Sequence, residues 1–219
     1  MLLAIDTSAG TSVAVVDRDA GVLAEFFEND TRRHAEVIGS LIVAALAEAG
    51  VAVTDLSGVA VGMGPGPFTG LRVGIAGARA FAFGAGKPVV PVVSHDAIAF
   101  GAFGGGSATA VPLANPEPLL VVTDARRREV YWSAYTGLDE LGLPVRVSGP
   151  GLVRPDDLAE TVPDFGRFTR LDAEVVSAAS IGLLAESLYA NKRPFAGSDA
   201  LYLRSPDIYA STGPKRVTR

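Results

Sequence analysis

Three short apolar runs at the start of the chain constrain the fold more than any other feature. They cover residues 2–6, 11–17 and 22–28, and the connectors between them carry Ser, Asp and Gly. Connectors of this kind make tight turns, so the three runs predict a meander of antiparallel strands. Because helices and further strands are predicted to alternate after the meander, we expect an α/β protein.

The rest of the amino-terminal half alternates between helix and strand. Apolar residues at helical spacing predict a helix over 31–49, with Gly50 as its C-terminal cap. The further predicted elements are a strand at 58–63, a helix over 69–83 capped by Thr69, a strand at 88–93 and a short helix from Ser94.

A segment rich in Gly, Pro and small residues at 101–118 is the predicted linker. It divides the chain into an N-terminal lobe over 1–104 and a C-terminal lobe over 105–219. In the second lobe we expect a hairpin from strands at 119–125 and 129–136, and a helix over 178–190. We expect this last helix and the polar, basic tail to pack back on the first lobe.

Composition excludes several classes of protein. The net charge is -5 and apolar residues make up 48% of the chain, which is typical of a globular domain and not of a protein that wraps duplex nucleic acid. There is no cysteine, so disulfides and thiolate metal sites are excluded. The N-terminus lacks the pattern of a signal peptide, and no apolar run resembles a membrane span. We therefore expect a soluble, cytoplasmic protein.

The stretch GMGPGPFTGLRVGIAGARAFAFG at 62–84 poses the central question. It lacks the lysine of a P-loop and the spacing of a dinucleotide fingerprint, which leaves only a general anion site at a helix N-terminus. Gly70, Gly74 and Gly77, extended by Ala78, share one face of the predicted helix and permit close packing of backbones. That face either packs inside its own domain, which is the simpler interpretation, or docks a partner.

Six segments together resemble the bacterial TsaB (YeaZ) family. They are AIDTS at 4–8, TSVAVVD at 11–17, HAE at 34–36, the glycine-rich stretch at 62–84, DARRREVYWSAY at 124–135 and ALYLRSP at 200–206. The segments occur in the same order and spacing as in the family and are spread across nearly the whole chain. The most specific are GPGPFTGLR and DAR…EVYW.

The resemblance implies the two-lobed fold shared by actin, sugar kinases and heat-shock ATPases (the ASKHA fold), with a mixed sheet flanked by helices in each lobe. It also implies a non-catalytic scaffold that activates the paralogue TsaD, which is joined by the TsaE ATPase. The complex transfers a threonylcarbamoyl group to the adenosine beside the anticodon of tRNAs. In this view tRNA is contacted indirectly, ATP acts in the complex, and no membrane is involved.

By the same resemblance, the first two helices form the heterodimer interface. The residues implied at the interface are His34, Ile38, Leu41, Ile42, Gly70, Arg72, Gly74, Gly77 and Ala78. The chain alone is expected to form a homodimer through the same helices.

TsaD-like proteins bind metal through two histidines four residues apart, after a strand. The comparable positions here are His95 and Ala99. One histidine is not a chelate, so we expect no metal site and no catalytic residue, with His95 beginning a helix.

The turn between the first two strands carries Asp6, Thr7, Ser8, Thr11 and Ser12. In the superfamily this turn approaches nucleotide phosphates, and these side chains suit that role. The alternative is a plain turn whose polar groups bond to their own backbone. A rival function, a stand-alone ATPase or small-molecule kinase, would use this turn at residues 5–12.

A run of three arginines, 126–128, sits beside Tyr131 and Trp132. A basic loop next to aromatic residues is one way to contact RNA. A solvated hairpin tip with balanced charges is the simpler interpretation, because no larger basic patch surrounds it in the sequence.

Overall fold

The computed structural model describes residues 1–105 and 117–204, so most of the predicted linker and the tail beyond residue 204 lie outside the described residues. The first sheet holds β1 (Leu2–Asp6), β2 (Thr11–Asp17), β3 (Gly21–Glu28), β4 (Gly58–Gly62) and β5 (Val89–Val92), in the order β3-β2-β1-β4-β5. Strands β1 to β3 pair antiparallel, as the meander predicts, whereas β4 and β5 continue the sheet in parallel with β1.

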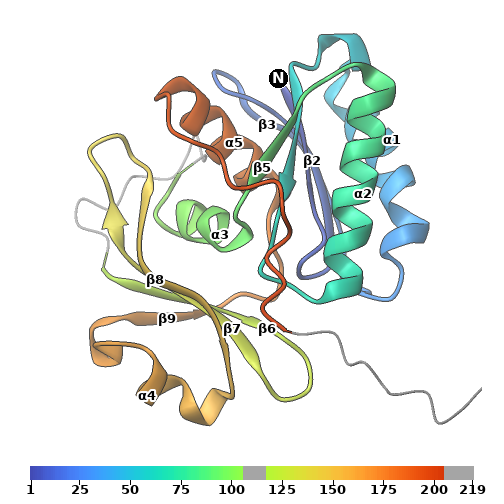
Figure 1. The fold of residues 1–219 in the computed structure, drawn as a ribbon. Helices are drawn as coiled ribbons and strands as arrows, with labels where there is room; N and C mark the ends of the chain where they lie inside the picture. The colour runs from blue at the N-terminus through green and yellow to red at the C-terminus, as the bar shows by residue number, and fades with distance from the viewer. Residues whose placement is uncertain (106–116, 205–219) are drawn as a thin grey trace, which may run out of the picture.

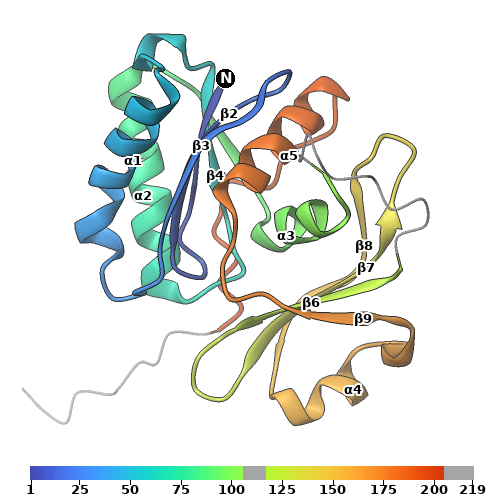
Figure 2. The ribbon, with the colours of Figure 1, turned by 180° about the vertical axis from the view of Figure 1, so that it is seen from behind.

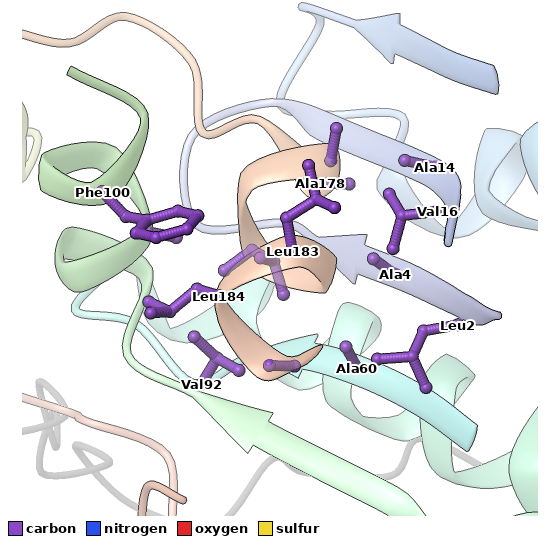
Figure 3. Packing of buried hydrophobic residues seen from close by; sticks show 14 of the residues in the cluster. Leu2, Ala4, Ala14, Val16, Ala60, Val92, Phe100, Ala178, Leu183 and Leu184 are labelled. Atoms are coloured by element: carbon purple, nitrogen blue, oxygen red, sulfur yellow. The ribbon is translucent and has the colours of Figure 1, made fainter. Parts of the chain in front are cut away.

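Helices cover both faces of this sheet (Figures 1 and 2). They are α1 (His34–Ala49) and α2 (Phe68–Ala85) on one face and α5 (Ala178–Ala190) on the other, with α3 (Ser94–Ala102) beside α5. Because side chains alternate along a strand, Leu3 and Ile5 of β1 pack under α1 and α2, whereas Leu2 and Ala4 pack under α5. Figure 3 shows the α5 side, where small residues of the sheet let the helix approach closely.

The second sheet has the order β8-β7-β6-β9. Its elements are β6 (Leu119–Asp124), β7 (Val130–Leu138), β8 (Pro144–Val153) and β9 (Thr169–Asp172), with a short helix α4 (Leu158–Thr161). The hairpin of β6 and β7 confirms the prediction for 119–136, but β8 and β9 were not predicted. Strand β8 contains Gly149, Pro150 and Gly151, which signal a turn, and its register with β7 shifts to accommodate them.

Two predicted helix starts are wrong in detail. Helix α1 begins at His34 and not at residue 31, and α2 begins at Phe68 directly after Pro67. The α2 start has no side-chain cap, so Thr69 does not cap it. Gly50 does close α1, with a positive φ as expected for a C-terminal cap. Within residues 1–105 and 117–204, no helix is both long and apolar enough to cross a bilayer.

His95 connects α3 to the second sheet through buried polar contacts. It lies on α3, which packs between the sheets, and the ring is fully buried. Its Nδ1 is 2.9 Å from the Ser133 hydroxyl on β7, and its Nε2 is 2.9 Å from the Thr123 hydroxyl on β6. Burial, followed by the charge of Arg146, lowers the pKa of His95 to about 3. The ring is therefore neutral at physiological pH.

This burial predicts a loss of stability in acid. The unfolded chain binds a proton on His95 below its ordinary pKa of 6.5, whereas the folded chain binds it only near pH 3. When the pH falls from about 7 to about 5, we expect His95 alone to lower the free energy of unfolding by about 2 kcal/mol. Urea denaturation of wild type and His95→Gln at both pH values measures this, because other groups contribute equally to the two proteins. A stability gap between them that does not narrow in acid would contradict the prediction.

Candidate functional site

The turn between β1 and β2, residues 6–12, brings the five predicted phosphate-binding side chains together, but it buries them. Asp6, Thr7, Ser8, Thr11 and Ser12 all lie in the interior. The strands on either side fix the turn, because β1 and β2 are central in the first sheet and pair up to Asp6 and Ser12. Whether these groups can serve a ligand therefore depends on what they already contact.

Asp6 is fully occupied by the chain itself. Its Oδ1 accepts hydrogen bonds from the Ser8 backbone at 2.7 Å and from the Ser8 hydroxyl at 2.5 Å. Its Oδ2 accepts a bond from the Ser94 hydroxyl at 2.6 Å, and Ser94 Oγ accepts the Gly64 amide. Burial raises the pKa of Asp6, although the bonds from Ser8 and Ser94 oppose this shift. The carboxyl holds the turn to the start of α3.

The remaining hydroxyls of the turn are also engaged. Thr7 donates to the Gly70 carbonyl at 2.7 Å, and Thr11 Oγ1 lies 2.8 Å from Nδ1 of His34. The Ser12 hydroxyl accepts the Ala178 amide at the start of α5. A phosphate bound by these side chains would have to displace bonds that hold three helices to the first sheet.

Four glycines explain how the stretch at 62–84 approaches the turn so closely. A Cβ at Gly62 would lie 1.8 Å from Asp6 Oδ2, and one at Gly66 would lie 2.7 Å from Ser8 Cβ. A Cβ at Gly70 would meet the Thr7 carbonyl at 2.5 Å, and one at Gly74 would meet Thr7 Oγ1 at 2.0 Å. These four glycines occupy every fourth position from 62 to 74, and all of them face residues 6–8. The close approach is to the first turn of the same chain.

The residues expected at a partner interface fall into three groups in the structure. Gly70, Gly74, Ala78, Ile42 and His34 are buried within the chain, so they present almost no surface. Gly77 faces Ile38, where a Cβ would lie 2.8 Å from Ile38 Cδ1, and this contact joins α1 to α2. Ile38 and Leu41 are partly buried, and only Arg72 is exposed.

The apolar residues that α1 and α2 expose are not among those expected at the interface. Val43 is 68% exposed and Phe83 is 90% exposed. Ala47 on α1 and Ala76 and Ala80 on α2 are also exposed. We call these five residues the outer face. The same helical periodicity that predicts the buried stripe also predicts this complementary face, so the signal was present in the sequence.

His34 illustrates how the fold uses a polar residue at a helix start. It is the first residue of α1 and points inward to Thr11, and its burial lowers the pKa. A cleft of about 530 Å³ opens beside it, with Ser8 and Thr69 in its wall from the first lobe and Arg126 and Glu174 from the second. Among the described residues, no three His, Asp or Glu side chains gather as a metal site.

Known proteins match this chain over most of its length. The sequence profile of the TsaD family, tRNA N6-adenosine threonylcarbamoyltransferase, matches residues 21–158. An uncharacterized protein of Mycobacterium tuberculosis strain H37Rv is 40% identical over 210 residues, which cover 94% of this chain and 92% of the relative. The tRNA threonylcarbamoyladenosine biosynthesis protein TsaB of Escherichia coli is 37% identical over 142 residues, which cover 65% of this chain and 57% of the relative.

A solved structure agrees. The structure described as YeaZ from Pseudomonas aeruginosa has a TM-score of 0.71 and 25% identity, and the match covers 93% of this chain and 99% of the other. Two mixed sheets flanked by helices define an ASKHA-type fold, as the sequence predicted. Within that class, the chain belongs to the TsaB (YeaZ) family of tRNA threonylcarbamoyladenosine biosynthesis proteins.

The glycine contacts predict the effect of one methyl group. We expect Gly74→Ala to lower the free energy of unfolding by about 1 to 3 kcal/mol, because its Cβ would overlap the buried, β-branched Thr7. Gly84→Ala in the same helix is the matched control, since a Cβ there meets nothing within 4 Å. It should be neutral or stabilise by up to about 1 kcal/mol. Equal shifts of the two urea midpoints would refute the close approach.

Proposed function

We propose that this chain is a non-catalytic subunit that activates TsaD by docking through the outer face of α1 and α2. The pair, joined by the TsaE ATPase, would transfer the threonylcarbamoyl group to the adenosine beside the anticodon of tRNAs in the cytoplasm. The observation that carries the proposal is the exposure of Val43 and Phe83 on neighbouring helices, together with the exposed alanines Ala47, Ala76 and Ala80 of the same helices.

The outer face suits close helix packing. Val43 and Ala47 are one turn apart on α1, and Ala76, Ala80 and Phe83 follow the i, i+4, i+7 spacing of one helix face on α2. Small side chains allow another helix to approach, while Val and Phe each contribute about 1.5 to 3 kcal/mol when they leave water. The buried glycines contribute indirectly, because they let α2 pack closely against Thr7 and so fix the position of its exposed face.

The first turn supports a role without nucleotide chemistry in this chain. Its hydroxyls and its carboxyl already bond within the fold. In the neighbouring cleft, Arg126 is paired with Asp124, and Glu174 adds a further negative charge. Such a wall does not offer the surplus positive charge that a triphosphate needs.

The residues at the two positions where TsaD-like proteins bind metal also support a non-catalytic role. Both ring nitrogens of His95 lie within hydrogen-bond distance of buried hydroxyls, and Ala99 stands where a second histidine would be needed. His95 therefore serves packing between the sheets, and the catalytic groups would come from TsaD.

A double substitution on the outer face tests the docking proposal. We expect Val43→Asp combined with Phe83→Asp to weaken binding to purified TsaD by about 100-fold or more, because two unpaired charges would enter an apolar contact. Light scattering after size exclusion measures the complex, and it also reports the homodimer that we propose for the chain alone.

Tyr189→Asp is the control for this test. Tyr189 is 74% exposed near the end of α5, away from α1 and α2 (Figure 2), and its substitution should leave the complex intact. The docking proposal fails if wild type does not bind TsaD, or if the double variant binds TsaD with the same affinity as Tyr189→Asp. ATP turnover by the purified chain alone would instead favour a stand-alone enzyme.

A further inference from the structure

The loop between β6 and β7 has the least usual backbone among the described residues. Arg126, Arg127 and Arg128 have φ values of 64°, 54° and 62°, so three consecutive residues with side chains adopt the left-handed conformation. This conformation is unfavourable for any residue with a Cβ, and it persists only where surrounding contacts impose it. All three arginines are exposed.

Contacts from three parts of the chain impose this loop. Within it, the Ala125 amide donates to the Glu129 carbonyl at 3.0 Å, and the Arg126 amide donates to Asp124 Oδ1 at 2.7 Å. Arg126 also reaches across to the first lobe, where its Nη2 donates to the Thr31 hydroxyl at 2.7 Å. From the C-terminal segment, Arg204 donates to the Arg126 carbonyl and pairs with Glu129.

These contacts place both acidic side chains of the loop in ion pairs. Asp124 pairs with Arg126, and Glu129 pairs with Arg204. Arg128 is exposed and makes no hydrogen bond or ion pair with the described part of the chain, so its charge is a local surplus. The overall charge of -5 is a sum over the whole chain and does not describe the local charge of this loop.

An exposed aromatic pair adjoins the loop. Tyr202 is two residues before Arg204, and its ring centroid lies 4.9 Å from that of Phe68 at the start of α2. Arg72 lies 4.8 Å over the Phe68 ring. Phe68 is 44% and Tyr202 is 41% exposed, whereas Tyr131 and Trp132, the aromatic residues next to the arginines in sequence, are buried. The accessible rings therefore come from other segments.

A ring contact, a cation–π contact and a hydrogen bond join these groups into one surface, which we call the basic ridge. It consists of Phe68, Arg72, Arg126–Arg128, Tyr202 and Arg204. In Figure 1 its segments are the β6–β7 loop, the start of α2 and the end of the described C-terminal segment, all at the same end of the molecule. Asp199 lines the next groove, but it shares that groove with Arg79 as well as Arg72.

We propose that the basic ridge binds an unpaired segment of the tRNA that the complex modifies, with arginines on phosphates and the aromatic pair against a base. Positive charge along a backbone beside exposed rings is the combination that recognises single-stranded nucleic acid. The identity of the RNA rests on the proposed function. The ridge lies beside the outer face and does not include Val43 or Phe83, so this chain presents RNA and partner contacts on separate residues.

Arg128→Gly is the decisive substitution, because glycine removes the charge and also tolerates the left-handed backbone. We expect it to weaken binding to a tRNA transcript about 3- to 10-fold and to reduce the slope of log affinity against log salt by about 1. Fluorescence anisotropy over a salt series measures both. The matched control is Lys192→Gly, since Lys192 is exposed, also has a positive φ of 54° and lies beyond the end of α5. It should leave affinity and slope unchanged.

A second substitution tests the aromatic part. Tyr202→Leu should weaken binding about 5-fold or more without changing the salt slope, because stacking releases no counterions. Far-ultraviolet circular dichroism and the urea midpoint establish that each variant is folded. If Tyr202→Leu changed the slope of log affinity against log salt but left the affinity unchanged, the stacking contact would be overturned.

Each binding measurement is made on the chain alone and in a mixture with TsaD, with light scattering to report the complex. If no complex forms but Arg128→Gly still differs from Lys192→Gly, the docking proposal fails and the RNA surface stands. If the complex forms and the two variants bind tRNA equally, the RNA surface fails and docking stands. An absence of measurable tRNA binding by wild type in both forms also overturns the RNA surface.

Discussion

The contact between α2 and Thr7 sets the position of much of the first lobe. Gly70 and Gly74 bring the helix backbone against the carbonyl and hydroxyl of Thr7, and the Thr7 hydroxyl donates back to Gly70. The helix depth that results places Gly77 against Ile38 of α1, so both helices share one layer. The surface that they expose is therefore a consequence of the turn that they cover. The turn therefore supports the packing of both helices.

Two buried polar centres connect this support to the rest of the molecule. Asp6 links the first turn to the start of α3 through Ser94, and the next residue along, His95, links α3 to the second sheet. Burial raises the pKa of the carboxyl and lowers that of the imidazole, so each favours its neutral form. The lobes are thus joined by buried hydrogen bonds in the interior, while the paired charges at Arg126 and Arg204 lie at the surface.

Much of the architecture was predictable because it depends on local patterns. The meander, α1, α2, α5 and the β6–β7 hairpin all have clear periodicity and turn residues. Strand β8 was missed because Gly149, Pro150 and Gly151 resemble a turn, yet pairing with β7 holds them in a strand with a shifted register. The sequence placed Gly70, Gly74, Gly77 and Ala78 on one helix face, but periodicity does not say what a face contacts: Gly70 and Gly74 meet Thr7, whereas Gly77 meets Ile38.

The sequence by itself determined the α/β class, the order of most elements, the family and the set of residues that gather at the first turn. These follow from short-range spacing and from motifs that are contiguous in the chain. Only the tertiary structure decided that the glycines face Thr7, that the hydroxyls of the turn are already bonded, and that Phe68, Tyr202 and the arginine loop form one surface. The Thr7–Gly70, Arg126–Arg204 and Ser12–Ala178 bonds join residues 63, 78 and 166 positions apart. Such pairings arise from packing of the sheets and helices, which no local pattern encodes.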